Sequence, residues 1–113
     1  MSAGARATAA TPDAAFDALA DRTRRAILEL LRLQHVMTAG ELASAFPEIS
    51  RPAVSRHLRL LREADLVDAS QEGREWRYRL NVAPLAELHQ QWFAQFAPLW
   101  EESLARLKST VES

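Results

Sequence analysis

The feature that most constrains the fold is the segment from Ser50 to Leu66, which reads S-R-P-A-V-S-R-H-L-R-L-L-R-E-A-D-L. Residues three and four positions apart lie on the same side of a helix, so this spacing predicts a helix with two unlike faces. The apolar face carries Val54, Leu58 and Leu61, flanked by Ala53, His57 and Ala64. The polar face carries Arg51, Ser55, Arg59 and Arg62, with Arg56 at its edge. We expect the first face, including His57, to pack against the protein and the second to carry arginine into solvent.

The start of this helix is marked by two residues with separate roles. Ser50 is a good N-cap, and Pro52 is tolerated in the first turn, where a backbone N–H has no partner within the helix. A helix of this width fits the major groove of duplex DNA. An arginine run on its own is usually only a solvated helix face, so the interpretation as a DNA contact depends on the neighbouring elements.

Three further helices are predicted before this one. Thr11 and Pro12 start the first, whose apolar side includes Phe16 and Leu19. Asp21 caps the second, R-T-R-R-A-I-L-E-L-L-R-L, whose apolar spacing is typical of a central core helix. The third opens with a capping box formed by Thr38 and Glu41 and ends at Pro47. The third helix and the arginine-bearing helix together form a helix-turn-helix.

A β-hairpin is predicted directly after the helix-turn-helix. Residues 67–71 and 75–80 alternate apolar and polar side chains, with a turn on Gly73 between them. The second strand places Trp76, Tyr78 and Leu80 on one face and Glu75, Arg77 and Arg79 on the other. The predicted fold is mainly α with this small hairpin: a winged helix-turn-helix with the element order α-α-α-α-β-β-α.

The last region, about residues 82–111, is more apolar than one small core requires. Asn81 is predicted to cap it and Pro98 to bend or split it. A large exposed apolar surface favours aggregation, whereas dimerisation removes it from water. The terminal helices are therefore predicted to form a symmetric dimer through Phe16, Leu19, Trp92, Phe96, Leu99, Trp100, Leu104 and Leu107. A role for some of these aromatic residues in an effector pocket remains an alternative.

The composition excludes several classes of site. The 113 residues suit one domain, with residues 1–10 as a disordered arm and 11–113 as the winged-helix domain. There is no cysteine, and the three histidines are widely spread, so we expect no metal site, no cofactor and no catalytic site. The formal net charge is only −1, but the basic residues concentrate in the helix and the hairpin. No membrane span or secretory signal is found, which predicts a cytoplasmic protein.

The order of these motifs, from T-A-G-E-L-A through S-R-P-A-V-S-R-H-L-R-L-L-R-E-A-D-L-V to E-G-R-E-W-R-Y-R-L, resembles the ArsR family of winged-helix repressors. The resemblance covers roughly Phe16 to Lys108, and Asp65 stands where many members have glycine. It implies a homodimer on a palindromic operator that represses until an effector alters it. Base-edge contacts then fall on Arg51, Ser55 and Arg56, and Arg59 and Arg62 are better placed for phosphates. The arginines of the hairpin themselves predict wing contacts at Arg74 and Arg77, with Arg74 at the tip best placed.

The metal sites of that family do not carry over to this chain. The positions of its cysteine pair hold Thr38 and Gly40. Glu87 and His89 match half of its other site, but the second half falls on Trp100 and Ser103. The effector and the operator stay open. Two alternatives also remain: a winged-helix protein-interaction module that does not bind DNA, and a metal-responsive repressor built on histidine and carboxylate.

Overall fold

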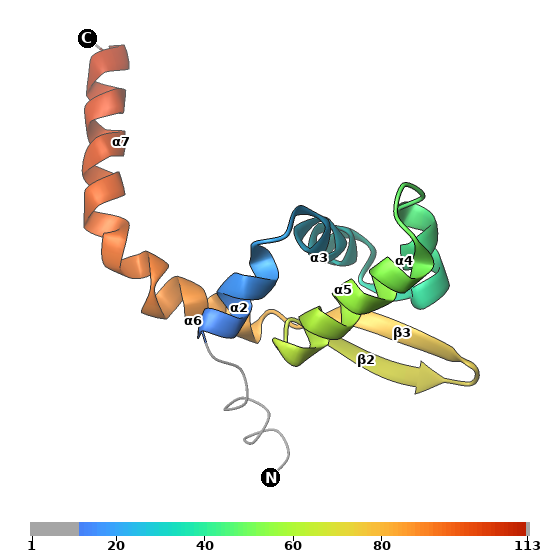
Figure 1. The fold of residues 1–113 in the computed structure, drawn as a ribbon. Helices are drawn as coiled ribbons and strands as arrows, with labels where there is room; N and C mark the ends of the chain where they lie inside the picture. The colour runs from blue at the N-terminus through green and yellow to red at the C-terminus, as the bar shows by residue number, and fades with distance from the viewer. Residues whose placement is uncertain (1–11, 113) are drawn as a thin grey trace.

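The structure is a computed structural model that describes residues 12–112; the predicted arm and the predicted cap Thr11 lie outside the described residues. The elements are α2 (Pro12–Leu19), α3 (Arg22–Gln34), β1 (Val36–Thr38), α4 (Ala39–Ala45), α5 (Arg51–Glu63), β2 (Val67–Glu72), β3 (Glu75–Leu80), α6 (Ala83–Gln91), the 3-10 helix η1 (Phe93–Phe96) and α7 (Ala97–Glu112). Figure 1 shows the hairpin β2–β3 and helix α7 projecting from opposite sides of the helical body.

The predicted caps of the three central helices are confirmed. Asp21, Thr38 and Ser50 each accept a hydrogen bond from the backbone N–H three residues further on, at 3.0, 3.1 and 3.2 Å. Glu41 completes the capping box by accepting from the backbone N–H of Thr38 at 2.8 Å. These bonds satisfy donors that would otherwise lack a partner in the first turn of each helix. The start of α5, and therefore the direction of its side chains, is defined locally.

The core lies where α3, α4 and α5 meet the sheet. Its largest fully buried side chains are Ile27, Leu31, Leu42, Val54, Leu61, Leu66 and Val67. Leu58 is also 2% exposed, so the predicted apolar face of α5 is buried as a unit. Burial of such a side chain stabilises the fold by about 1.5–3 kcal/mol. The core therefore holds α5 with its opposite, arginine-bearing face turned outward.

The sheet has three antiparallel strands in the order β1-β3-β2, one more strand than the sequence predicts. The additional strand β1 is only three residues long and pairs with the inner half of β3, with Met37 opposite Tyr78. Alternation cannot be recognised over three residues, and the partners of this strand lie about forty positions away. The turn on Gly73, which has φ 66°, is confirmed, and Asp65 has φ 59° at the end of α5. Asp tolerates this left-handed conformation better than most residues.

The C-terminal region is split, as the proline predicts, but the break lies before Pro98. Helix α6 ends at Gln91, η1 follows, and Pro98 falls in the first turn of α7, where its missing N–H has no cost. The N-cap position of α6 is Val82, one residue later than predicted. The Asn81 side-chain oxygen still accepts a hydrogen bond from the backbone N–H of Ala83, the first residue of α6, at 3.4 Å. The Asn81 side-chain amide also donates to the Asp65 carbonyl oxygen at 2.8 Å and ties the end of α5 to the start of α6.

Candidate nucleic-acid interface

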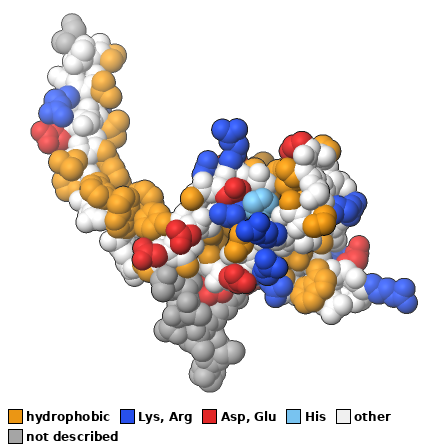
Figure 2. All heavy atoms as spheres, in the orientation of Figure 1, with side chains coloured by type: hydrophobic (Ala, Val, Ile, Leu, Met, Phe, Trp, Pro, Cys, Tyr) orange, Lys and Arg blue, Asp and Glu red, His pale blue; other side chains and the backbone are white. Residues whose placement is uncertain are grey.

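The outward face of α5 carries the five residues that the sequence predicts as DNA contacts there. Arg51, Ser55, Arg56, Arg59 and Arg62 are all exposed. At 100° per residue, Arg51, Ser55, Arg59 and Arg62 fall within about 80° of each other around the helix axis. Figure 2 shows basic side chains gathered over α5, with further ones toward the tip of the hairpin. The arrangement is a continuous basic stripe along one rigid element.

The charges of this stripe are not neutralised locally. Among residues 12–112, Arg51, Arg56 and Arg59 form no ion pair or side-chain hydrogen bond. An arginine without an acidic neighbour keeps its full positive potential and its fork of donors for a phosphate or a guanine edge. The α5 face is therefore available for an anionic partner.

The arginines of the hairpin differ from one another. Arg74 lies beside Gly73 in the turn, is exposed and has no ion pair within the described chain. Arg77 is half-buried, and its guanidinium lies 3.6 Å from Glu72 and 3.4 Å from Glu75. Arg79 also pairs with Glu72, at 3.8 Å. The turn therefore carries an uncompensated charge, whereas the charges along the strand are balanced.

A contact that the sequence analysis does not predict joins α5 to the hairpin. The Arg62 guanidinium carbon lies 5.5 Å from the ring centroid of Trp76, within the range of a cation–π interaction. Trp76 is 41% exposed, although it shares a strand face with the buried Tyr78. The sequence feature that could have indicated this contact is Trp76 itself, a large aromatic residue at the outer end of β3.

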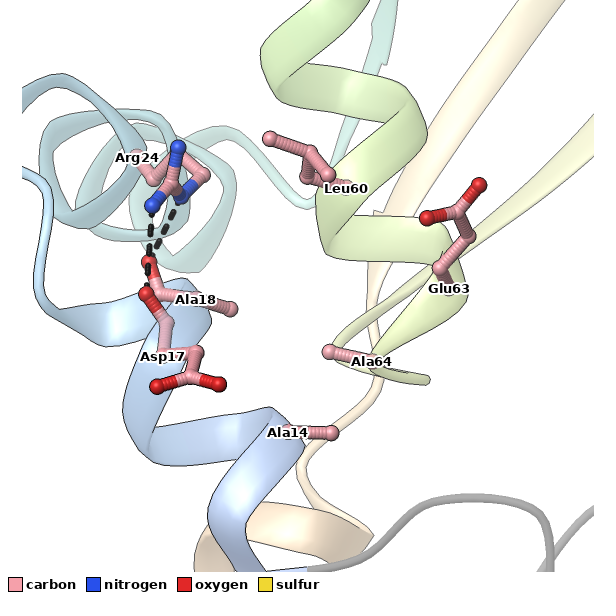
Figure 3. A pocket seen from close by; sticks show the side chains of 7 residues that line it. All are labelled: Ala14, Asp17, Ala18, Arg24, Leu60, Glu63 and Ala64. Atoms are coloured by element: carbon pink, nitrogen blue, oxygen red, sulfur yellow. Dashed lines mark hydrogen bonds between the residues drawn. The ribbon is translucent and has the colours of Figure 1, made fainter.

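A polar cluster at the inner edge of α5 changes the expected role of His57. His57 Nδ1 lies 3.3 Å from Arg24 Nη1 and 3.8 Å from Asp21 Oδ2, so the residue meets charged groups as well as the apolar face. Figure 3 shows Arg24 also donating to the carbonyl oxygens of Ala18 and Asp17, at 2.8 and 3.1 Å. Arg24 thus joins the end of α2 to α3 and α5.

A hollow of about 250 Å³ opens beside this cluster, between α2 and the last turn of α5. The residues that line it are Ala14, Asp17, Ala18, Arg24, Leu60, Glu63 and Ala64. Its walls therefore belong to α2, to the C-terminal end of α5 and, through Arg24, to α3.

The pKa of the Asp21 carboxyl is held below its ordinary value. The main cause is the hydrogen bond that it accepts from the Arg24 backbone N–H. Partial burial opposes this effect and is the next largest cause, and His57 and Arg24 lower the pKa further. A carboxyl whose pKa is lower in the folded state stabilises the protein above its unfolded pKa, about 3.9. That stabilisation is lost as the pH falls through the folded value.

Replacing Asp21 by alanine is expected to lower the free energy of unfolding by about 1 kcal/mol at pH 7, because α3 loses its N-cap. The difference from the wild type should shrink as the pH falls below about 4 and through the lower folded-state pKa of Asp21, because the carboxyl is protonated in both states only below that folded value. Urea unfolding at pH 7 and pH 3, at one protein concentration, measures both values. Asp21→Asn, which retains a capping oxygen, is the control. Equal stability of wild type and Asp21→Ala at pH 7 would contradict this role.

Seven of the eight residues predicted to form a dimer lie on two adjoining surfaces, whereas Leu19 packs against the core. Phe16 of α2 packs edge-on against Trp92, with ring centroids 5.3 Å apart, and Trp92 contacts Phe96 at 4.9 Å. Beyond them, Leu99, Trp100, Leu104 and Leu107 are 64, 41, 61 and 63% exposed along α7. Figure 2 shows apolar side chains running over α6, η1 and one side of α7. An extended exposed apolar surface of this kind marks an interaction site on a protein that stays in water.

Among residues 12–112, no three side chains of His, Cys, Asp or Glu converge on a point that could hold a metal ion. None of the described helices has both the length and the apolar character needed to cross a bilayer.

Two short helices joined by a tight turn, the second exposed and basic, followed by a β-hairpin, define a winged helix-turn-helix protein. A family described as a helix-turn-helix domain matches residues 19–68. The HTH-type transcriptional regulator Rv2034 of Mycobacterium tuberculosis is 48% identical over 104 residues, which cover 91% of each chain. The transcriptional repressor SdpR of Bacillus subtilis is 40% identical over 72 residues, 64% of this chain and 78% of that protein.

Solved structures give the same result. An ArsR-like transcriptional regulator from Rhodococcus sp. RHA1 superposes with a TM-score of 0.68 at 35% identity, over 89% of this chain and 90% of that one. The chain belongs to the ArsR family of DNA-binding transcriptional regulators, which confirms the predicted family and winged-helix fold. Its relatives regulate transcription and are not enzymes.

Proposed function

We propose that this regulator is a homodimeric repressor that binds an inverted-repeat operator with one α5 helix in each half-site. The observation that carries the proposal is the exposed stripe of Arg51, Arg59 and Arg62, with no acidic partner for Arg51 or Arg59 among residues 12–112. Arg51, Ser55 and Arg56 lie toward the N-terminal half of α5 and are assigned to base edges. Arg59 and Arg62 are assigned to phosphates.

The hairpin is assigned the flanking contact of the wing. Arg74, whose charge is uncompensated at the turn, is placed at the minor groove next to the site read by α5. Arg77 is assigned a secondary role, because its ion pairs with Glu72 and Glu75 must break before its guanidinium can contact a phosphate. The wing therefore adds affinity mainly through its tip.

The dimer interface is assigned to the aromatic cluster of Phe16, Trp92 and Phe96 together with the apolar side of α7. The predicted interface residues from Trp92 to Leu107 support it by their exposure, and Phe16 supports it by its contact with Trp92, whereas Leu19 packs against the core. Two-fold symmetry would place the two α5 helices about 34 Å apart, one turn of DNA. Residues 11–113 then act as one unit that contains both the DNA-binding and the dimerising parts. Because a transcriptional repressor must reach chromosomal DNA, we also propose that this protein is located in the cytoplasm.

Binding to duplex DNA of random sequence tests this function. Two phosphate-binding arginines in each protomer neutralise about four phosphates in the dimer, so affinity should fall about 10²-fold between 50 and 200 mM salt. Fluorescence anisotropy of a labelled duplex measures this fall. A module that binds only proteins would show little affinity for the duplex at either salt concentration, and that result would overturn the proposal. Unchanged operator affinity with and without zinc would exclude a metal-responsive repressor.

A further inference from the structure

Arg62 differs from the other arginines of the α5 stripe, because a residue of the wing fixes it. Its guanidinium carbon lies 5.5 Å from the Trp76 ring centroid, whereas Arg51 and Arg59 have no such partner among residues 12–112. No carboxylate of the described chain pairs with Arg62. Its direction is therefore restrained while its charge is left uncompensated.

The position of Trp76 follows from the register of the hairpin. Trp76 lies two residues outward from Tyr78 on the same strand face, and Gln71 is its direct partner on β2. Tyr78 is buried against the core, but Trp76 lies beyond the core's edge and remains 41% exposed. The Trp76 ring, left half in water at this position, lies under the Arg62 guanidinium of α5.

We propose that Trp76 is a positioning residue for DNA binding: its ring holds the Arg62 guanidinium in the direction of the phosphate backbone and ties the wing to α5. The inference rests on the proposed function, because Arg62 is assigned to a phosphate there. A free arginine loses side-chain entropy when it contacts DNA, and a ring that restrains it beforehand removes part of that loss. The cation–π contact leaves the donors of the guanidinium free for phosphate.

A double-mutant cycle on DNA affinity tests the inference. Trp76→Ala is expected to weaken binding to operator and random duplex alike, by about three- to tenfold, and to reduce the salt dependence as Arg62→Ala does. The double variant should bind no more weakly than Arg62→Ala alone, because Trp76 acts through Arg62. Trp76→Phe, which keeps an aromatic ring, should recover part of the affinity. Gln71→Ala, at the cross-strand neighbour, is the control and should bind as the wild type does.

Each other outcome has a defined meaning. If the wild type binds duplex DNA but the two effects multiply in the double variant, the inference is wrong and the proposed function stands. If the wild type does not bind duplex DNA, the proposed function itself fails. Trp76→Leu retains apolar packing without the ring, so a stable Trp76→Leu that binds and responds to salt like the wild type would also overturn the inference.

Discussion

Replacing Arg51 by alanine is expected to reduce the preference for the operator over a mutated operator by roughly 30-fold or more. A bidentate contact from arginine to guanine discriminates between bases by about 1–3 kcal/mol, and a symmetric dimer makes the contact twice. Arg51 is exposed at the first position of α5, so the loss should come from recognition rather than from folding. Competition between the two duplexes at one salt concentration measures the preference.

Arg62→Ala is the matched comparison for that result. Arg62 lies on the same face of α5 but at its last turn, where we assign it to a phosphate. Its removal should weaken binding to both duplexes equally and lower the salt slope by about one unit for each phosphate that is no longer neutralised. Equal loss of discrimination in the two variants would show that base and phosphate roles are not divided along α5 as assigned.

Leu104→Glu is expected to separate the dimer into monomers and, as a consequence, to abolish tight operator binding. A leucine buried at the interface contributes about 1.5–3 kcal/mol to the free energy of association, and a two-fold dimer contains this leucine twice. The dimer dissociation constant should therefore rise by a factor of about 10² or more. Leu104 is 61% exposed in the protomer, so its replacement should leave the protomer folded. Sedimentation equilibrium measures the association, and thermal unfolding checks the fold.

Glu102 provides the control for this substitution. It pairs with Arg106 at 3.4 Å on the same helix and points about 160° away from Leu104 around the axis. Glu102→Ala should therefore leave the association unchanged. A Leu104→Glu protein that sediments as a dimer and binds the operator normally would place the interface elsewhere.

The parts of the fold that could be predicted from sequence are those decided within a few residues. The caps at Asp21, Thr38 and Ser50 bond to backbone groups three positions away, so the residue types themselves indicate where these helices begin. The turn at Gly73 is equally local, because it needs a positive φ that glycine accepts. Each of these features was predicted without knowledge of the tertiary structure.

The missed features depend on residues distant in the chain. Strand β1 exists because Met37 meets Tyr78, and three residues carry no recognisable period. His57 contacts Arg24 from a helix 33 positions away, so its apolar position on α5 suggested packing alone. In the same way, the contact between Trp76 and Arg62 follows from the angle between wing and helix, which no sequence pattern records.

Selection of bound duplexes from a random pool tests most directly whether two α5 helices read DNA as a symmetric pair. We expect the recovered sequences to contain an inverted repeat whose half-sites are centred about 10 base pairs apart. A single site without symmetry, or a pool with no enriched sequence, would contradict a symmetric pair of DNA-reading α5 helices.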